Sequence, residues 1–132
     1  MRYPVSGTAT TVLTGGTTAN KNLLGAGITA GRQLWLRQAY IHNYGATYAP
    51  VFLCDVSGGA TGPTGILNCS DGYLNSVRYV IATCSGATQN FDNPTVINFP
   101  APGLKFTNYC TVLMDGTCTA TAIIAGGYGY EE

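Results

Sequence analysis

The stretch Gln33-Leu-Trp-Leu-Arg-Gln-Ala-Tyr-Ile-His-Asn43 decides the fold class, because its length and residue types are those of a β-strand. Strict alternation would place Leu34, Leu36, Gln38 and Tyr40 on one face and Trp35, Arg37, Ala39 and Ile41 on the other. Both faces carry apolar residues, so we expect a second sheet on one and a neighbouring molecule on the other. Trp35 then packs either in the core or between subunits, and the sequence leaves both open.

The turn Asn43-Tyr-Gly-Ala-Thr47 follows this strand, and Tyr48–Val56 reads as the next one, so we expect the two to form a hairpin. Pro50 moves the start of the second strand toward an edge or a bulge. Asp115-Gly116 predicts a second hairpin, between Tyr109–Met114 and Cys118–Ala125. The remaining predicted strands are Thr8–Thr14, Gly65–Cys69, Ser76–Thr83 and Thr95–Phe99.

Glycine-rich turns recur about every ten residues along the 132-residue chain, and no twelve-residue stretch has a helical period. This spacing predicts an all-β domain over residues 8–125, a β-sandwich of about eight short antiparallel strands resembling a jelly roll. Residues 1–7 are expected to form an extended N-terminal arm, and residues 126–132 a flexible C-terminal tail with Tyr128, Tyr130 and Glu131.

Charged residues make up 9% of the chain, roughly a third of the usual share, and the net charge is zero. Six basic residues do not build a nucleic-acid-binding patch, and 45% hydrophobic residues exclude a disordered chain. No apolar run is long enough to span a bilayer, and no secretory signal is visible, so we expect synthesis in the cytoplasm. A surface this poor in ions tends to associate with other surfaces.

Groups that could support catalysis or bind a metal are sparse. The lone histidine, His42, lies within a strand, and Asp55, Asp71, Asp92 and Asp115 lie at turns, where aspartate usually caps the turn. Gln89–Asn93 offers oxygens but no calcium-loop pattern. We therefore expect no enzyme, no cofactor and no metal site.

The five cysteines are odd in number and form no C-x-x-C pair, which argues against both a zinc site and a disulfide framework. We expect buried free thiols, and a single bridge between facing strands stays open. The five are Cys54, Cys69, Cys84, Cys110 and Cys118.

Two segments carry a resemblance to a known class. Gly31-Arg32 leads through the long strand and the turn at Asn43 to a second strand that ends in Asp55. Pro102-Gly-Leu-Lys-Phe-Thr-Asn108 is followed by a Val-rich strand, Asp115-Gly-Thr117 and a final Ala/Thr strand. This order, over roughly residues 28–125, resembles small β-sandwich virion proteins of tailed bacteriophages, of the capsid decoration (cement) type. Cys54 and Cys110 stand where that pattern has an aromatic and a small residue.

The resemblance implies a non-enzymatic virion structural protein on the outside of the capsid. It would bind the major capsid protein, often as a homotrimer, and stabilise the shell by bridging its subunits. The residues we expect to bind partners are Arg2, Tyr3, Trp35, Tyr128, Tyr130 and Glu131. The alternative is a tail or fibre module that binds a host surface glycan through aromatic side chains at loop tips.

Overall fold

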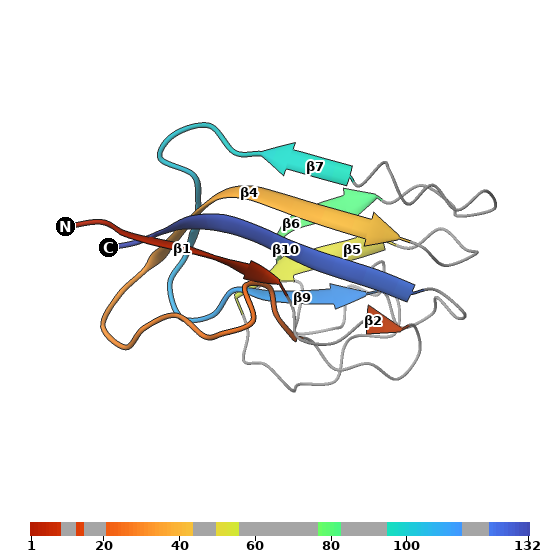
Figure 1. The fold of residues 1–132 in the computed structure, drawn as a ribbon, viewed down its shortest axis with the longest axis horizontal. Coiled ribbons are helices and arrows are strands. Elements are labelled where there is room, and N and C mark those ends of the chain that lie inside the picture. Colours follow the sequence, from red (N-terminus) through yellow and green to blue (C-terminus); the bar gives the residue numbers. More distant parts are fainter. Residues whose placement is uncertain (9–12, 15–20, 44–49, 56–76, 83–94, 115–121) are drawn as a thin grey trace.

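A computed structural model describes residues 1–8, 13–14, 21–43, 50–55, 77–82, 95–114 and 122–132 (Figure 1). Every regular element among these residues is a β-strand, and every strand pair is antiparallel. The all-β prediction is therefore confirmed. In the described part of the chain, no helix has the length and hydropathy needed to cross a membrane.

The larger of the two sheets has six strands and is built around two ten-residue strands, β4 (Leu34–Asn43) and β10 (Ala122–Glu131), which pair with each other. The other edge of β10 pairs with β1 (Tyr3–Thr8) and β2 (Leu13–Thr14). The other edge of β4 pairs with β7 (Thr95–Asn98) and β8 (Leu104–Phe106).

The smaller sheet has the strand order β3 (Lys21–Asn22), β9 (Thr111–Met114), β5 (Pro50–Cys54) and β6 (Val77–Ala82). Pro50 is the first residue of a strand that has neighbours on both sides, a position where the missing N–H is tolerated. The start of the strand is paired on one side only, since Pro50 pairs with Ala82 of β6 while the pairing with β9 begins at Val51, which agrees with an edge-like start at the proline.

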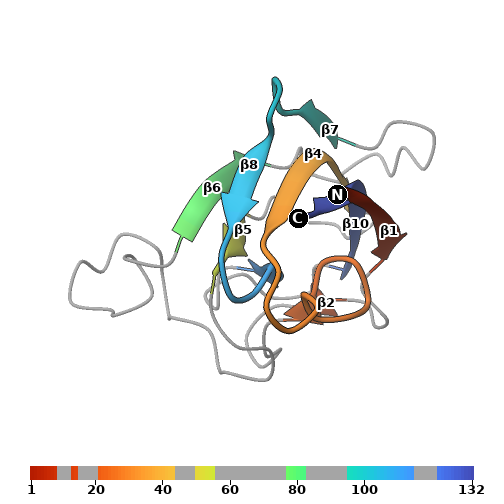
Figure 2. The same ribbon diagram turned by 90° about the vertical axis from the view of Figure 1, so that its left-hand side faces the viewer.

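Figure 2 shows strands of both sheets seen from one end, and buried side chains from both sheets form the core. One cluster of buried residues takes members from the six-stranded sheet and from the four-stranded sheet. The fully buried members include Leu34, Leu36, Ile41 and Ile123 from the first, and Val51, Leu53, Ile81 and Val112 from the second. At the rim, the rings of Tyr79 and Phe99 meet edge to face, with centroids 5.1 Å apart.

A β-bulge changes the face on which β4 buries its side chains. Tyr128 pairs with Gln38 and Gly129 with Leu36, so Arg37 is the extra residue on β4. Leu34 and Leu36 point into the core before the bulge, and Ala39 and Ile41 after it. Strict alternation along this strand was therefore a wrong prediction, and Trp35 lies outside the buried core.

Both predicted hairpins are also wrong, because in each case the two strands belong to different sheets. β4 lies in the six-stranded sheet and β5 in the four-stranded sheet, and β9 and β10 are divided in the same way. The connections at 44–49 and 115–121 therefore link the sheets. A local turn motif therefore does not determine whether the two strands that flank it pair with each other.

Both chain ends differ from the expected arm and tail. Residues 3–8 form β1, and residues 126–131 complete β10, which lies between β1 and β4 (Figure 1). Six consecutive residue pairs, from Tyr3 with Glu131 to Thr8 with Gly126, join the two ends in one sheet. The reason is backbone hydrogen bonding, which orders a glycine-rich segment once it has a strand on each side. Of the predicted strands, Gly65–Cys69 lies outside the described residues.

Candidate interaction surface

Five of the six predicted partner-binding residues come together at one end of the six-stranded sheet. The pairing of β1, β10 and β4 places Tyr3 beside Glu131 and Glu131 beside Leu34. One step along, Pro4, Tyr130, Trp35 and Lys105 form a row across four strands. We call this end, with Arg2, Tyr3, Trp35, Tyr130 and Glu131, the terminal cluster. Figure 2 shows the N- and C-termini close together at this end of the sheet.

Glu131 is the buried centre of the terminal cluster, with 5% of its surface exposed. Its Oε1 accepts a hydrogen bond from the backbone N–H of Thr29 at 3.0 Å, and its Oε2 lies 3.4 Å from Nη1 of Arg32. Burial raises the pKa of this carboxyl, but the hydrogen bonds from Thr29 and the Arg32 charge outweigh burial, so the pKa is lowered overall. Glu131 therefore ties the loop before β4 to the end of β10.

Three of the six basic residues in the chain lie over aromatic rings at this end. The guanidinium of Arg32 is 3.6 Å from the ring centroid of Tyr3, and that of Arg2 is 4.7 Å from the centroid of Tyr130. The ammonium of Lys105 is 5.5 Å from the centroid of Trp35. Such contacts stabilise a surface by about 0.5–1 kcal/mol each.

Other contacts hold the two ends in place. Arg2 Nε is 3.4 Å from Glu132 Oε2, and the hydroxyl of Tyr130 donates to the carbonyl oxygen of Pro102 at 3.0 Å. The backbones of Gln33 and Glu132 exchange two hydrogen bonds of 2.9 and 3.0 Å. The terminal cluster is thus internally bonded, unlike the extended arm and flexible tail that were expected.

Tyr128, the sixth predicted residue, belongs to a different part of the same sheet. It is 48% exposed on the outer face, beside Gln38, whose Nε2 donates to Oδ1 of Asn98 at 2.7 Å. Ile124 on the same strand and Val96 on β7 are 37% and 47% exposed, and Val96 pairs with half-buried Tyr40. We call Tyr40, Val96, Ile124 and Tyr128, with Gln38 and Asn98, the outer patch.

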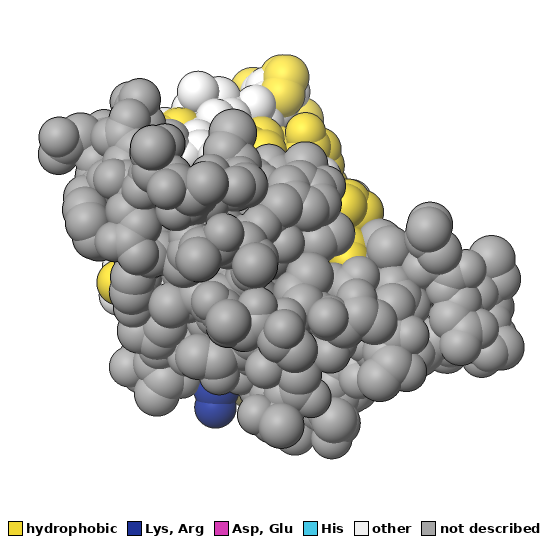
Figure 3. Space-filling view, turned by 90° about the vertical axis from the view of Figure 1, so that its right-hand side faces the viewer, with side chains coloured by type: hydrophobic (Ala, Val, Ile, Leu, Met, Phe, Trp, Pro, Cys, Tyr) yellow, Lys and Arg dark blue, Asp and Glu magenta, His cyan; other side chains and the backbone are white. Residues whose placement is uncertain are grey.

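The outer patch contains no charged residue. Strand alternation adds Ser6, Thr8 and His42 to this part of the face, and none of these is an acid, a lysine or an arginine. Further along the same face, Lys105 lies in the row with Trp35 and Tyr130. Among the described residues in the end view of Figure 3, hydrophobic side chains gather at the upper right and a basic one appears on the lower edge. An exposed face of this kind is suited to binding another surface.

Asp55 connects the two segments that carried the family resemblance. Its Oδ2 accepts a hydrogen bond from the backbone N–H of Thr107 at 2.8 Å, and its Oδ1 accepts two, from Asn108 at 3.1 Å and Tyr109 at 2.7 Å. Nη2 of Arg78 lies 3.7 Å from Oδ2, and the aspartate side chain is 3% exposed. The turn that Asp55 was predicted to cap lies outside the described residues, and the three hydrogen bonds come from a segment more than fifty positions away.

The remaining candidates for chemistry are dispersed or lie outside the described residues. His42 is half-buried on β4, and Cys54 and Cys110 are buried free thiols. Burial raises the pKa of Cys54 to about 12, and it also raises that of Cys110. Over the described ranges, no three His, Cys, Asp or Glu side chains are grouped to hold a metal. Asp71, Asp92, Asp115, Gln89–Asn93, Cys69, Cys84 and Cys118 lie outside those ranges.

Sequence reasoning missed the residues that organise the terminal cluster, namely Thr29, Arg32 and Lys105. Gly31-Arg32 at the start of the long strand was noticed, but the contacts of Arg32 with Glu131 and Tyr3 were not, because neither residue is a sequence neighbour of Arg32. Comparison with protein-family models, curated proteins and solved structures finds no match.

Proposed function

We propose that this chain is a non-enzymatic virion structural protein that decorates the outside of a phage capsid. It binds the major capsid protein through the outer patch and bridges neighbouring subunits. We further propose that its two sheets form a jelly-roll-like β-sandwich and that it acts as a homotrimer. The observation that carries this proposal is the outer patch, an exposed surface with Val96, Ile124 and Tyr128 on it and no charged residue among its described members.

The contacts of the basic residues within the chain support attachment to the capsid through apolar and amide groups rather than through charges. Arg2, Arg32 and Lys105 lie over aromatic rings, and Arg78 lies beside Asp55. These cations are engaged within the chain, so attachment that uses the outer patch depends little on ion pairs with the shell. Because salt screens exposed charges, attachment through this patch should persist in molar salt. Binding to the assembled shell also stabilises it by mass action.

The first test is the number of copies in particles produced by the genome that encodes the chain. Quantitative mass spectrometry of gradient-purified particles, before and after a molar-salt wash, should find hundreds of copies that resist the wash. A handful of copies, or loss of the protein in salt, contradicts decoration of the shell.

The second test uses two equally exposed valines that lie on different sheets. Val96 on β7 and Val80 on β6 are both 47% exposed. Val96→Asp places a carboxylate in the outer patch and should reduce capsid occupancy about tenfold or more, because a charge must be desolvated on binding. Val80→Asp is the matched control and should keep occupancy. Equal occupancy of the two variants rules out the outer patch as the contact.

The glycan-binding alternative has one observation in its favour. Tyr128 lies beside the amides of Gln38 and Asn98, and a sugar ring can pack on an aromatic ring while its hydroxyls bond amides. A glycan array probed with the isolated protein distinguishes the two functions. Binding that is lost in Tyr128→Ala, together with a low copy number, would favour a tail or fibre module.

A further inference from the structure

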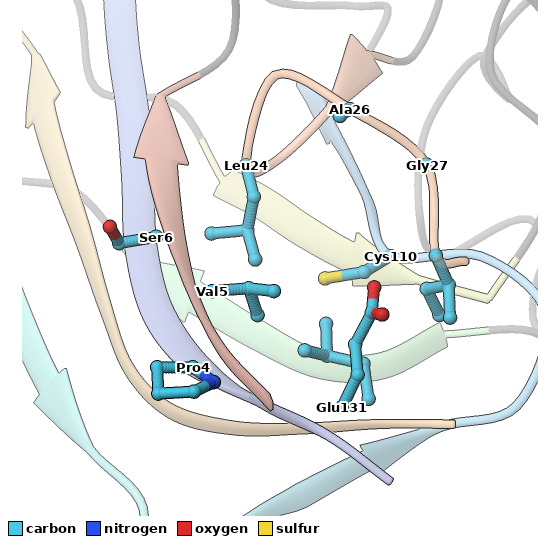
Figure 4. Close-up of a pocket in the computed structure, with 10 residues that line it drawn as sticks. Pro4, Val5, Ser6, Leu24, Ala26, Gly27, Cys110 and Glu131 are labelled. Carbon is cyan, nitrogen blue, oxygen red and sulfur yellow. The ribbon is translucent and has the colours of Figure 1, made fainter. Parts of the chain in front are cut away.

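A cavity of about 380 Å³ opens beside β1, at the edge of the six-stranded sheet (Figure 4). The loop that follows β3 lies against this edge. At Gly7 the contact is so close that a Cβ would overlap the carbonyl oxygen of Leu24. The cavity lies next to this contact, between Pro4–Ser6 and residues 24–28. Its volume falls within the usual range for small-molecule sites.

The cavity has a mixed lining, with apolar side chains along its sides, Ser6 at its edge and the Glu131 carboxylate at its base. Val5, Leu24 and Ile28 are half-buried and line its sides, and all three pack against the main core. Leu34, Cys110 and Glu131 are buried beneath them. Figure 4 shows the side chains of Leu24, Val5, Cys110 and Glu131 converging from four different segments.

The Glu131 carboxylate keeps acceptor capacity on this side. Each carboxylate oxygen can accept two hydrogen bonds. Glu131 accepts one from the Thr29 backbone N–H at 3.0 Å, one from the Thr29 side chain and one from Arg32 Nη1 at 3.4 Å, which leaves room for one more. The second distance exceeds the 2.7–2.9 Å that is typical of a charge-assisted hydrogen bond. Arg32 nevertheless balances the charge of Glu131, so a cationic ligand would gain little binding energy. An anionic ligand would be repelled, because the carboxylate of Glu131 lines the cavity.

We propose that this cavity binds a small, uncharged, largely apolar molecule with one hydrogen-bond donor, of the indole or phenol class. Its ring packs between Val5, Leu24 and Ile28, and its N–H or O–H donates to Glu131. The site is separate from the outer patch, so this proposal does not depend on capsid binding. A buried carboxylate under apolar walls selects for the donor, because a ligand without one leaves the acceptor unpaired.

The test uses indole, 1-methylindole and tryptamine as probes, with ligand-observed NMR and protein chemical shifts as readouts. Indole should bind with a Kd on the order of 1 mM, as expected for nine heavy atoms. 1-Methylindole, which lacks the donor, should bind about tenfold more weakly. Tryptamine adds an ammonium group and should not bind more tightly than indole.

Two variants in the same loop test whether indole binds in this cavity. Gly27 lines the cavity and is exposed, and a Cβ there meets no heavy atom within 4 Å, so Gly27→Leu can fill the opening without strain. Ala30→Leu changes an exposed residue outside the lining and is the control. Gly27→Leu should abolish indole binding, and Ala30→Leu should keep it. No indole binding to the native protein, undiminished binding to Gly27→Leu, or tighter binding of tryptamine would each overturn the proposal.

Discussion

The carboxylate of Asp55 accepts a 2.7 Å hydrogen bond from the backbone N–H of Tyr109, across 54 positions of sequence. Asp55 follows β5, and Tyr109 precedes β9, its neighbour in the four-stranded sheet. Two further N–H groups, of Thr107 and Asn108, donate to the same side chain. One buried acid therefore fixes the path of the chain as it passes from β8 in one sheet to β9 in the other.

Replacing Asp55 with alanine should lower the free energy of unfolding by about 2–4 kcal/mol, because three backbone donors lose a charged acceptor. Asp55→Asn keeps one acceptor oxygen, so its free energy of unfolding should lie between those of the native protein and Asp55→Ala. Urea denaturation at pH 7 measures the difference, with Glu132→Gln at an exposed acid as the control. A loss below about 0.5 kcal/mol for the alanine variant would mean that the loop at 107–109 holds its conformation without Asp55.

Glu131 predicts a dependence of stability on pH. Its pKa is lowered in the folded protein, so its contribution is fully present above the ordinary glutamate value of about 4.3 and is lost as the pH falls through the lower folded value. At pH 7, Glu131→Gln should be less stable than the native protein by about 1–3 kcal/mol. The gap should close progressively below about pH 4. Denaturation at a series of pH values measures it, and a gap that is constant down to pH 2 contradicts this assignment.

The sequence predicted where most strands lie better than it predicted their partners. The strands β4, β5, β6 and β7 lie within predicted segments. These segments could be recognised because β-branched and aromatic residues between turn signals are typical of strands. Pairing depends on the whole fold. The turn after Asn43 and the one at Asp115 looked like hairpin turns, yet both join strands of different sheets.

The C-terminal residues are a second case in which the sequence alone did not predict the pairing. Gly126-Gly-Tyr-Gly-Tyr reads as flexible chain, because glycine is a poor strand former in isolation. In the structure the alternation of the segment continues that of Ile123 and Ala125, with Gly127, Gly129 and Glu131 inward and both tyrosines outward. The extended alternation was visible in the sequence. The cations that cover Tyr3, Trp35 and Tyr130 were not, because no local pattern links residues so far apart.

Cys54 and Cys110 should be unreactive in the folded protein. Both are buried, and burial raises the pKa of each thiol, with that of Cys54 reaching about 12, so almost no thiolate forms at pH 8. Pulse alkylation at pH 8 with peptide mapping should label both at least a hundredfold more slowly than in 8 M urea. Rapid labelling of either position in the native protein would show that the strand carrying it opens readily.

Gly129 should tolerate no side chain, because β4 runs too close to it. An added Cβ would overlap the carbonyl oxygen of Trp35 and lie 2.9 Å from the Cα of Leu36, both of which are backbone atoms that cannot move aside. Gly129→Ala should therefore force β4 and β10 apart at the bulge and lower the free energy of unfolding by about 1–3 kcal/mol. Gly27→Ala is the matched control, since its Cβ would meet open space. Thermal unfolding compares the two, and equal melting temperatures would contradict the close approach of these strands. Because Trp35 pairs with Tyr130 beside this point, its fluorescence should also change in Gly129→Ala and stay constant in Gly27→Ala.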